Sequence, residues 1–216
     1  MSKSFFKDWT LTKLDKRFGL KQIRMLPELE EWLSAESDLS EFERMSLLAM
    51  QESAILQVDS WNEQEYSLNF IGPLLLLVNF VDEEFNAFAQ RYLSGVVDGE
   101  EMHGYPDGII AQGRREPEVP YFCLQEYKRE KDPEGDPAGQ CMAAMLVAQE
   151  LNQNQQPIYG SYVAGRNWFF MTLRDKEYAI SNSYTITHEQ IFDIFRVLKT
   201  LKKKIVANLK NSKVTE

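Results

Sequence analysis

Apolar residues follow a helical spacing in three parts of the first 80 residues of this chain. Pro27, which is followed by acidic residues, marks a helix start because the first turn accepts proline and favours negative charge. Ser40 and Glu43 have the spacing of a capping box, and Asn62 is placed to cap a helix that continues into the apolar run 70–81. The pattern therefore predicts helices in residues 26–35, 39–58 and 62–78.

From about residue 88 onward the pattern changes to the strand-like type. Two such runs flank Asp98-Gly99, a dipeptide that favours a tight hairpin turn, and the second run continues through "YPDGIIAQG". A third strand is "YFCLQEYK", residues 121–128, which contains no glycine or proline. A further pair of strands meets at Gly165, and residues 176–184 add a short one.

Two more helices complete the predicted elements. One covers residues 138–152, and the other is a long amphipathic helix that follows Thr187. This order of elements predicts an α/β sandwich in which a central mixed sheet has helices on both sides. We expect residues 1–60 to form a helical N-terminal extension packed on a main domain of residues 61–216. The apolar stripe of the last helix consists of Ile191, Ile194, Phe195, Leu198, Leu201, Ile205 and Leu209.

Composition narrows the functional classes. The net charge of −9 argues against a protein that holds nucleic acid by bulk electrostatics, so such a role would need a local positive patch or metal ions. Two cysteines suggest neither a disulfide framework nor a zinc site, and two histidines weaken histidine-based catalysis. The sequence shows no secretory signal, and the run 70–81 is too short to span a bilayer. We expect a cytoplasmic protein without a membrane partner.

Charged residues stand at an unexpected place in the strand 121–128. Alternation puts Phe122 and Leu124 on one face of that strand. The same face continues with Glu126 and Lys128, although buried charge is costly unless it is paired or binds a metal. Asp107 lies on the preceding strand, so hairpin pairing would bring it to Glu126. The sequence therefore predicts two carboxylates and an amine at one point.

Such a group has a recognisable chemistry. Two adjacent carboxylates repel, and a shared proton or a divalent cation relieves the repulsion. Carboxylates together with waters and carbonyls suit a hard ion such as Mg²⁺. An ammonium beside them could orient a water or stabilise developing negative charge. Acid, acid and amine around a metal describe a site that hydrolyses phosphodiesters.

The same residues resemble a known superfamily. "PDGII", with Asp107, followed by "QEYK", with Glu126 and Lys128, resembles the PD-(D/E)xK nucleases of the restriction-endonuclease-like fold. The upstream segment "NEQEYSLNFIGPLL" resembles the first helix of the nuclease domains of type I restriction enzymes. The order of elements from Glu63 to about Leu173 fits the α-β-β-β-α-β core of that superfamily. The chain also resembles small stand-alone bacterial members.

The resemblance implies roles for further residues. Asp107 and Glu126 would hold Mg²⁺, or Mn²⁺ in its place, with the backbone carbonyl of Tyr127 as a further ligand. Glu63 would complete the metal site, and Glu65 is a possible substitute for it. Gln140, on the helix after the third strand, would position substrate.

The function implied is metal-dependent hydrolysis of nucleic acid, of DNA rather than RNA. In it Lys128 would position the attacking water. A homodimer is a further possibility, since nucleases that cut both strands are commonly dimers. The alternative function is a catalytically silent binding or scaffold protein on the same fold. A third reading is an oligomeric protein built on the amphipathic C-terminal helix.

Each candidate residue also has a plain structural interpretation. Asp107 could be a turn residue after proline. Glu126 and Lys128 could line a solvated face, but that register would bury Gln125. Glu63 could simply serve the dipole of its helix.

The remaining polar features have structural interpretations as well. Gln140 could line a helix face. The lysine run 199–204 is typical of a solvated helix end, although it could contact phosphate. Arg166 has no assigned role.

Overall fold

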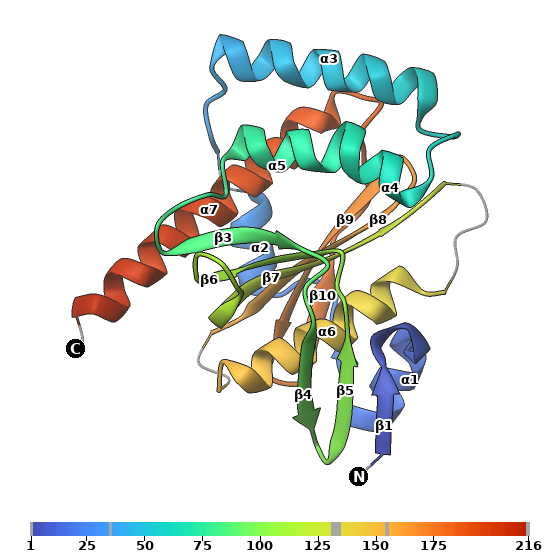
Figure 1. Ribbon diagram of the computed structural model, residues 1–216, viewed down its shortest axis with the longest axis vertical. Coiled ribbons are helices and arrows are strands. Elements are labelled where there is room, and N and C mark those ends of the chain that lie inside the picture. Colours follow the sequence, from blue (N-terminus) through green and yellow to red (C-terminus); the bar gives the residue numbers. More distant parts are fainter. Residues whose placement is uncertain (1, 35, 131–134, 154–155, 215–216) are drawn as a thin grey trace.

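An eight-stranded mixed sheet forms the middle layer of the computed structural model (Figure 1). The structure describes residues 2–34, 36–130, 135–153 and 156–214. β7 is an inner strand that pairs antiparallel with β6 on one side and parallel with β8 on the other. The order across the sheet is β2 (Lys21–Gln22), β10 (Glu177–Ile180), β9 (Asn167–Arg174), β8 (Ile158–Ala164), β7 (Glu118–Lys128), β6 (Gly108–Gln112) and β3 (Phe85–Ala89), with β11 (Tyr184–Thr185) paired to β9.

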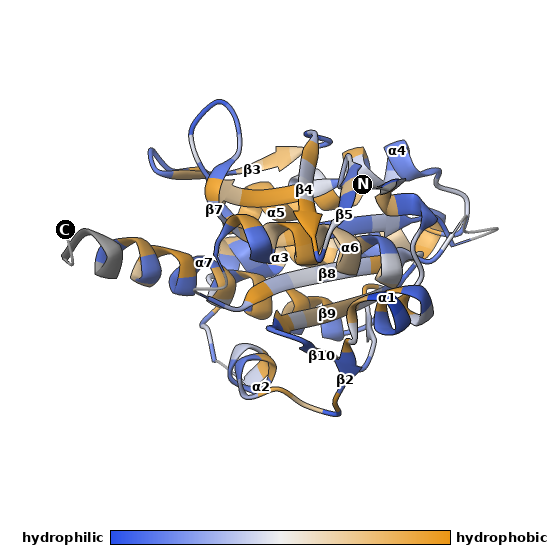
Figure 2. Ribbon diagram, turned by 90° about the horizontal axis from the view of Figure 1, so that it is seen from below, coloured by the Kyte–Doolittle hydropathy of each residue, from blue (hydrophilic) through white to orange (hydrophobic). Residues whose placement is uncertain are grey.

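Helices cover both faces of this sheet, which confirms the predicted α/β sandwich. One face packs against α2 (Pro27–Ser34), α3 (Glu41–Gln57), α4 (Glu63–Tyr66), the π-helical turn η2 (Ser67–Ile71), α5 (Gly72–Val78) and α7 (Gln190–Val214). The other packs against α6 (Pro137–Leu151), α1 (Leu11–Phe18), the 3-10 turn η1 (Phe6–Asp8) and a small sheet of β1 (Ser2–Phe5), β5 (Glu100–Gly104) and β4 (Leu93–Val97). The outer helices carry hydrophilic residues along much of their length (Figure 2).

The predicted helix starts are confirmed, two of them by capping contacts. α2 begins at Pro27. The Ser40 hydroxyl accepts the amide of Glu43 at 3.2 Å, and the Glu43 carboxylate accepts the amide of Ser40 at 2.7 Å. The Asn62 side chain accepts the amide of Glu65 at 2.9 Å, so it caps the helical segment that runs into α5. These local bonds satisfy amides that a helix leaves unpaired at its start.

Two strand predictions need correction. Residues 1–60 are not only helical, because β1 pairs with β5 and β2 pairs with β10. Such short strands exist through tertiary pairing, which local sequence does not encode. The strands β4 and β5 do form the predicted hairpin around Asp98-Gly99, but they belong to the small sheet. The chain leaves that sheet before Pro106, which lacks an amide for a ladder bond, so Asp107 precedes β6 instead of lying on the second hairpin strand.

The alternation predicted for residues 121–128 is also corrected. β7 is buried on both faces, so Gln125 and Glu126 are 1% and 8% exposed. A bulge skips Phe122, since Ile110 pairs with Cys123 and the next residue of β6 pairs with Tyr121. Phe122 therefore packs into the α5–α7 core, whereas Leu124 packs into the α6 core. An extra residue in one strand moves the side chains of the residues before it to the opposite face of the sheet.

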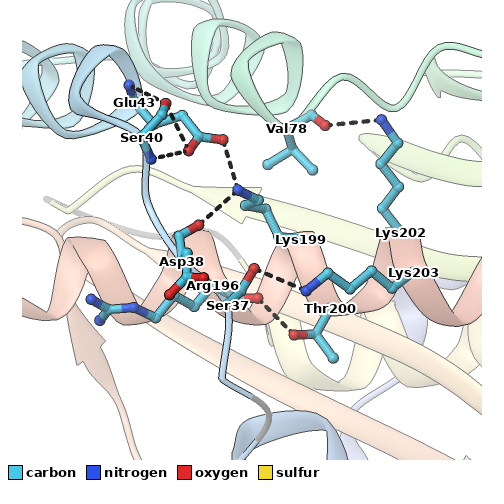
Figure 3. Close-up of polar contacts among 10 residues, drawn as sticks. All are labelled: Ser37, Asp38, Ser40, Glu43, Val78, Arg196, Lys199, Thr200, Lys202 and Lys203. Carbon is cyan, nitrogen blue, oxygen red and sulfur yellow. Dashed lines mark hydrogen bonds and ion pairs between the residues drawn. The ribbon is translucent and has the colours of Figure 1, made fainter.

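The lysines of α7 fasten other elements to it, which corrects their interpretation as a solvated helix end (Figure 3). Lys199 binds the Glu43 carboxylate and the Asp38 carbonyl at 2.8 and 2.9 Å. Lys202 reaches the carbonyl that ends α5, and Lys203 reaches Ser37. α3 and the loop before it are thereby attached to α7.

The apolar stripe of α7 is buried in the core of the same chain. Leu198 and Leu201 at its centre are fully buried, and Leu209 near its end is 8% exposed. The reading of this stripe as the basis of an oligomer is therefore wrong for residues 191–209. Within the described part of the chain, no helix is long and apolar enough to cross a membrane.

Candidate active site

The start of β6 and the end of β7 bring the predicted site residues together. The two strands are antiparallel neighbours, and Gly108 pairs with Gln125. Asp107 stands just before the first of these strands, and Lys128 is the last residue of the second. Because antiparallel strands place one strand's start beside the other's end, residues 20 apart in sequence meet here.

Short polar contacts connect these residues. An oxygen of the Asp107 carboxylate accepts the backbone amide of Tyr127 at 2.7 Å. The Lys128 ammonium lies 3.1 Å from the Glu126 carboxylate and 3.4 Å from that of Glu63 on α4. Asp107, Glu63, Glu126 and Lys128 are therefore one cluster, as the sequence predicted.

Burial shifts the pKa values of the residues in this cluster. Burial raises the pKa of Glu126 to about 7, the negative charge of Asp107 adds to the increase, and Lys128 opposes it. The pKa of Asp107 is also raised, chiefly by burial, against the stabilising amide of Tyr127. Burial alone would lower the pKa of Lys128, but Glu126, Glu63 and Asp107 together raise it. The site thus holds more negative charge than one ammonium compensates, and a further cation would be favourable there.

Glu63 and Glu65 have different surroundings. The Glu63 side chain is 48% exposed and is the member of the cluster nearest to solvent. The Glu65 carboxylate accepts the amide of Asn62 at 2.9 Å in the capping box. Glu65 is therefore engaged in stabilising the helix start, and the geometry favours Glu63 as the acid that reaches Lys128.

Gln140 lies on α6, a different element from those that carry the acidic cluster. It is buried on the first turn of α6, and its amide nitrogen fills the space where a side chain at Gly135 would begin. Within the described residues, no hydrogen bond joins the Gln140 side chain to Asp107, Glu126 or Lys128. Its role in positioning substrate stays a prediction.

Sequence reasoning did not identify the residues that hold the Asp107 backbone. The backbone amide of Gln90 donates a hydrogen bond to the Asp107 carbonyl at 3.2 Å. Beside Gly108, the Tyr127 hydroxyl donates a hydrogen bond to the Gln125 side chain. A methyl group on Gly108 would come within 2.5 Å of Gln125 Oε1 and 2.9 Å of the Tyr127 hydroxyl. The glycine after Asp107 is the sequence feature that could have predicted this packing, since close packing of side chains over the backbone requires glycine.

The segment after β7 is fixed by a charged pair. Arg166 donates to both carboxylate oxygens of Glu130 with three contacts of 2.7 to 3.0 Å. The amide of Gly165 also donates to the Lys128 carbonyl at 2.9 Å. Arg166 therefore has a structural role that the sequence left unassigned. Lys131, in the basic run 128–131, lies outside the described residues.

A groove between α5 and β3 opens onto the cluster. Its volume is about 770 Å³, and we call it the α5–β3 groove. Glu63, Asp107 and Tyr127 are among the residues that line it. Its apolar lining includes Ile71, Leu75, Leu76, Phe80, Val81 and Phe88.

The cluster contains oxygen donors, but they are few for a hard divalent cation. Asp107 and Glu126 offer carboxylates beside one another, and oxygen ligands suit Mg²⁺, which keeps several waters in most protein sites. Across the described ranges, no group of three or more histidine, cysteine, aspartate or glutamate side chains is arranged to hold a metal ion. Lys128, which contacts both Glu63 and Glu126, already supplies positive charge at that position. Among the described residues, the chain could supply the Asp107 and Glu126 carboxylates and the Tyr127 carbonyl, and Glu63 as a further ligand stays a prediction.

Comparison with known proteins gives no independent assignment. No protein-family model matches the chain. No curated protein matches its sequence significantly.

Proposed function

We propose that this protein is a metal-dependent nuclease of the PD-(D/E)xK type that hydrolyses phosphodiester bonds in DNA. The observation that carries the proposal is the cluster itself, in which Asp107, Glu126 and Lys128 meet at the junction of β6 and β7. The succession of α4–α5, β3, β6, β7, α6 and β8 around the central sheet supports assignment to the restriction-endonuclease-like fold.

Asp107 and Glu126 would hold Mg²⁺, with the Tyr127 carbonyl as a third ligand. When bound, the ion would lower the pKa of a coordinated water and offset the charge that develops on the phosphate. The raised pKa of Glu126, which results from burial and from Asp107, favours this assignment because a cation would relieve both effects.

Lys128 would orient the attacking water and donate to the phosphate oxygens as negative charge develops on them. In the reaction the water oxygen forms a bond to phosphorus and gives up a proton to solvent, while the bond to the leaving sugar oxygen breaks and that oxygen takes up a proton from solvent. Glu63, which contacts Lys128 from the solvent side, would keep the ammonium in place before substrate arrives.

A cleavage assay tests the proposal. Purified protein is incubated with single-stranded and duplex DNA and with RNA, in Mg²⁺ or Mn²⁺. We expect cleavage by the wild type and its loss in Asp107→Ala and Lys128→Ala. Lys176→Ala is the matched control, because it also removes a lysine from an ion pair, the one with Asp98. Equal inertness of wild type and variants on every substrate would refute the nuclease.

A second candidate is a catalytically silent binding protein on the same fold. The contacts of Lys128 with Glu126 and Glu63 favour it, because these charges partly satisfy one another without a metal. Calorimetric titration with Mg²⁺ and Mn²⁺ separates the two candidates. Absence of binding that depends on Asp107 would favour the silent protein.

A further inference from the structure

The α5–β3 groove differs in character from the acidic cluster, with which it shares Glu63 and Asp107. Its walls come from η2, α5 and β3, and they are mainly apolar. None of the described residues that line it is a lysine or arginine, and its only charged members are Glu63 and Asp107. A groove without cations gives a phosphate backbone no compensating charge, so it suits the uncharged part of a ligand.

The groove also has the size of a small-molecule site. A volume of about 770 Å³ lies within the range of about 300–1,000 Å³ that such sites occupy. At its rim, Leu76 and Val81 are 71% and 60% exposed, so a ligand could still bury apolar surface there. Phe80, Phe88 and Tyr127 add aromatic side chains to the lining.

Continuity with the cluster indicates which uncharged group would bind. The groove and the cluster share Asp107 and Glu63, so a nucleotide with its phosphate at the cluster has its base within reach of the groove. Nucleobases are flat, neutral and readily buried against apolar and aromatic side chains. In an intact duplex the bases are paired and stacked inside, and extracting one costs free energy that an unpaired base does not require.

We propose that the α5–β3 groove accepts an unpaired nucleobase next to the phosphate at the cluster, which makes single-stranded nucleic acid the preferred substrate. This inference rests on the proposed nuclease function. Because the apolar walls contact the face of the base and carry few polar groups, recognition is tolerant of base sequence.

Binding and cleavage are measured separately to test it. Binding uses Lys128→Ala, to prevent turnover, and a fluorescent single-stranded oligothymidine against a duplex of the same length, by anisotropy with Mg²⁺ present. We expect the single strand to bind at least about tenfold more tightly, because the duplex must lose a base pair. In the wild-type protein, cleavage should show the same order.

A variant of the groove rim gives the matched comparison. Leu76→Asn, in the Lys128→Ala background, removes apolar surface from the rim without adding charge and should weaken single-strand binding about fivefold. Leu56→Asn on α3 is the control, since Leu56 is 70% exposed, nearly as much as Leu76, and does not line the groove. Leu56→Asn should leave binding unchanged.

The outcomes separate this inference from the function on which it rests. The groove assignment would be overturned, and the nuclease left intact, if the protein bound and cut duplex as well as it does single strands. An unchanged affinity in Leu76→Asn would have the same consequence. Single-strand binding sensitive to Leu76→Asn, without any cleavage by the wild type, would uphold the groove and overturn the nuclease. Neither binding nor cleavage would overturn both.

Discussion

Replacing Glu126 by glutamine should stabilise the protein at alkaline pH. Burial, reinforced by Asp107, raises the pKa of Glu126 from 4.5 to about 7 in the folded state. The folded protein therefore binds this proton more tightly than the unfolded chain does. Stability from this group is complete below pH 4.5 and is lost as the pH rises through about 7.

The size of the effect follows from the change in pKa. An increase from 4.5 to about 7 corresponds to about 3 kcal/mol of unfolding free energy above pH 7. Glu126→Gln keeps the shape and cannot ionise, so its advantage over wild type should be near zero at pH 4.5 and grow to about 3 kcal/mol at pH 8. For a chain of this size, that corresponds to roughly 6–12 °C in melting temperature.

Urea unfolding of both proteins from pH 4.5 to 8.5, without metal, measures this difference. Glu52→Gln, on the exposed face of α3, is the control. Added Mg²⁺ should stabilise the wild type at pH 8 and narrow its gap to Glu126→Gln, since the cation would bind the ionised carboxylate. A gap that stays constant across the pH range, or a variant less stable than wild type at pH 8, would refute the reasoning.

Two further variants test the packing around the site and the attachment of α3. Gly108→Ala should lower the unfolding free energy by about 1–3 kcal/mol, because its methyl group collides with the Gln125 side chain and the Tyr127 hydroxyl; a melting temperature equal to wild type would show that these groups move aside freely. Lys199→Met should speed hydrogen exchange in α3 by severing its contact with Glu43, and unchanged exchange there would mean that apolar packing alone holds the helix.

Local patterns predicted the elements well and their environment less well. Helix starts at Ser40 and Asn62 depend on bonds between residues three apart, and Pro27 with the acids after it marks the start of α2, so the sequence reveals all three directly. The strand of residues 121–128 was predicted as well, but its burial on both faces was not. That burial depends on β8, which pairs with it in parallel and follows only after α6.

The cluster could be predicted from short stretches of sequence, whereas the contacts that support it could not. Glu126 and Lys128 are two residues apart on one strand, and Asp107 follows proline just before the neighbouring strand, so spacing alone brought them together. The contact of Glu63 with Lys128, and the amide that Gln90 donates, join separate elements. Such contacts depend on how layers pack, which no short window of sequence contains.

The N-terminal strands and helices have their partners far along the chain. The Trp32 indole donates to the Val197 carbonyl at 2.8 Å, and the Asp136 carboxylate accepts the amides of both Leu11 and Gly139 at 3.0 Å. During synthesis at about 5–20 residues per second, Trp32 waits roughly 8–33 s before Val197 has been added. The first 60 residues therefore leave the ribosome with apolar faces that nothing yet covers, and their docking is a late event in folding.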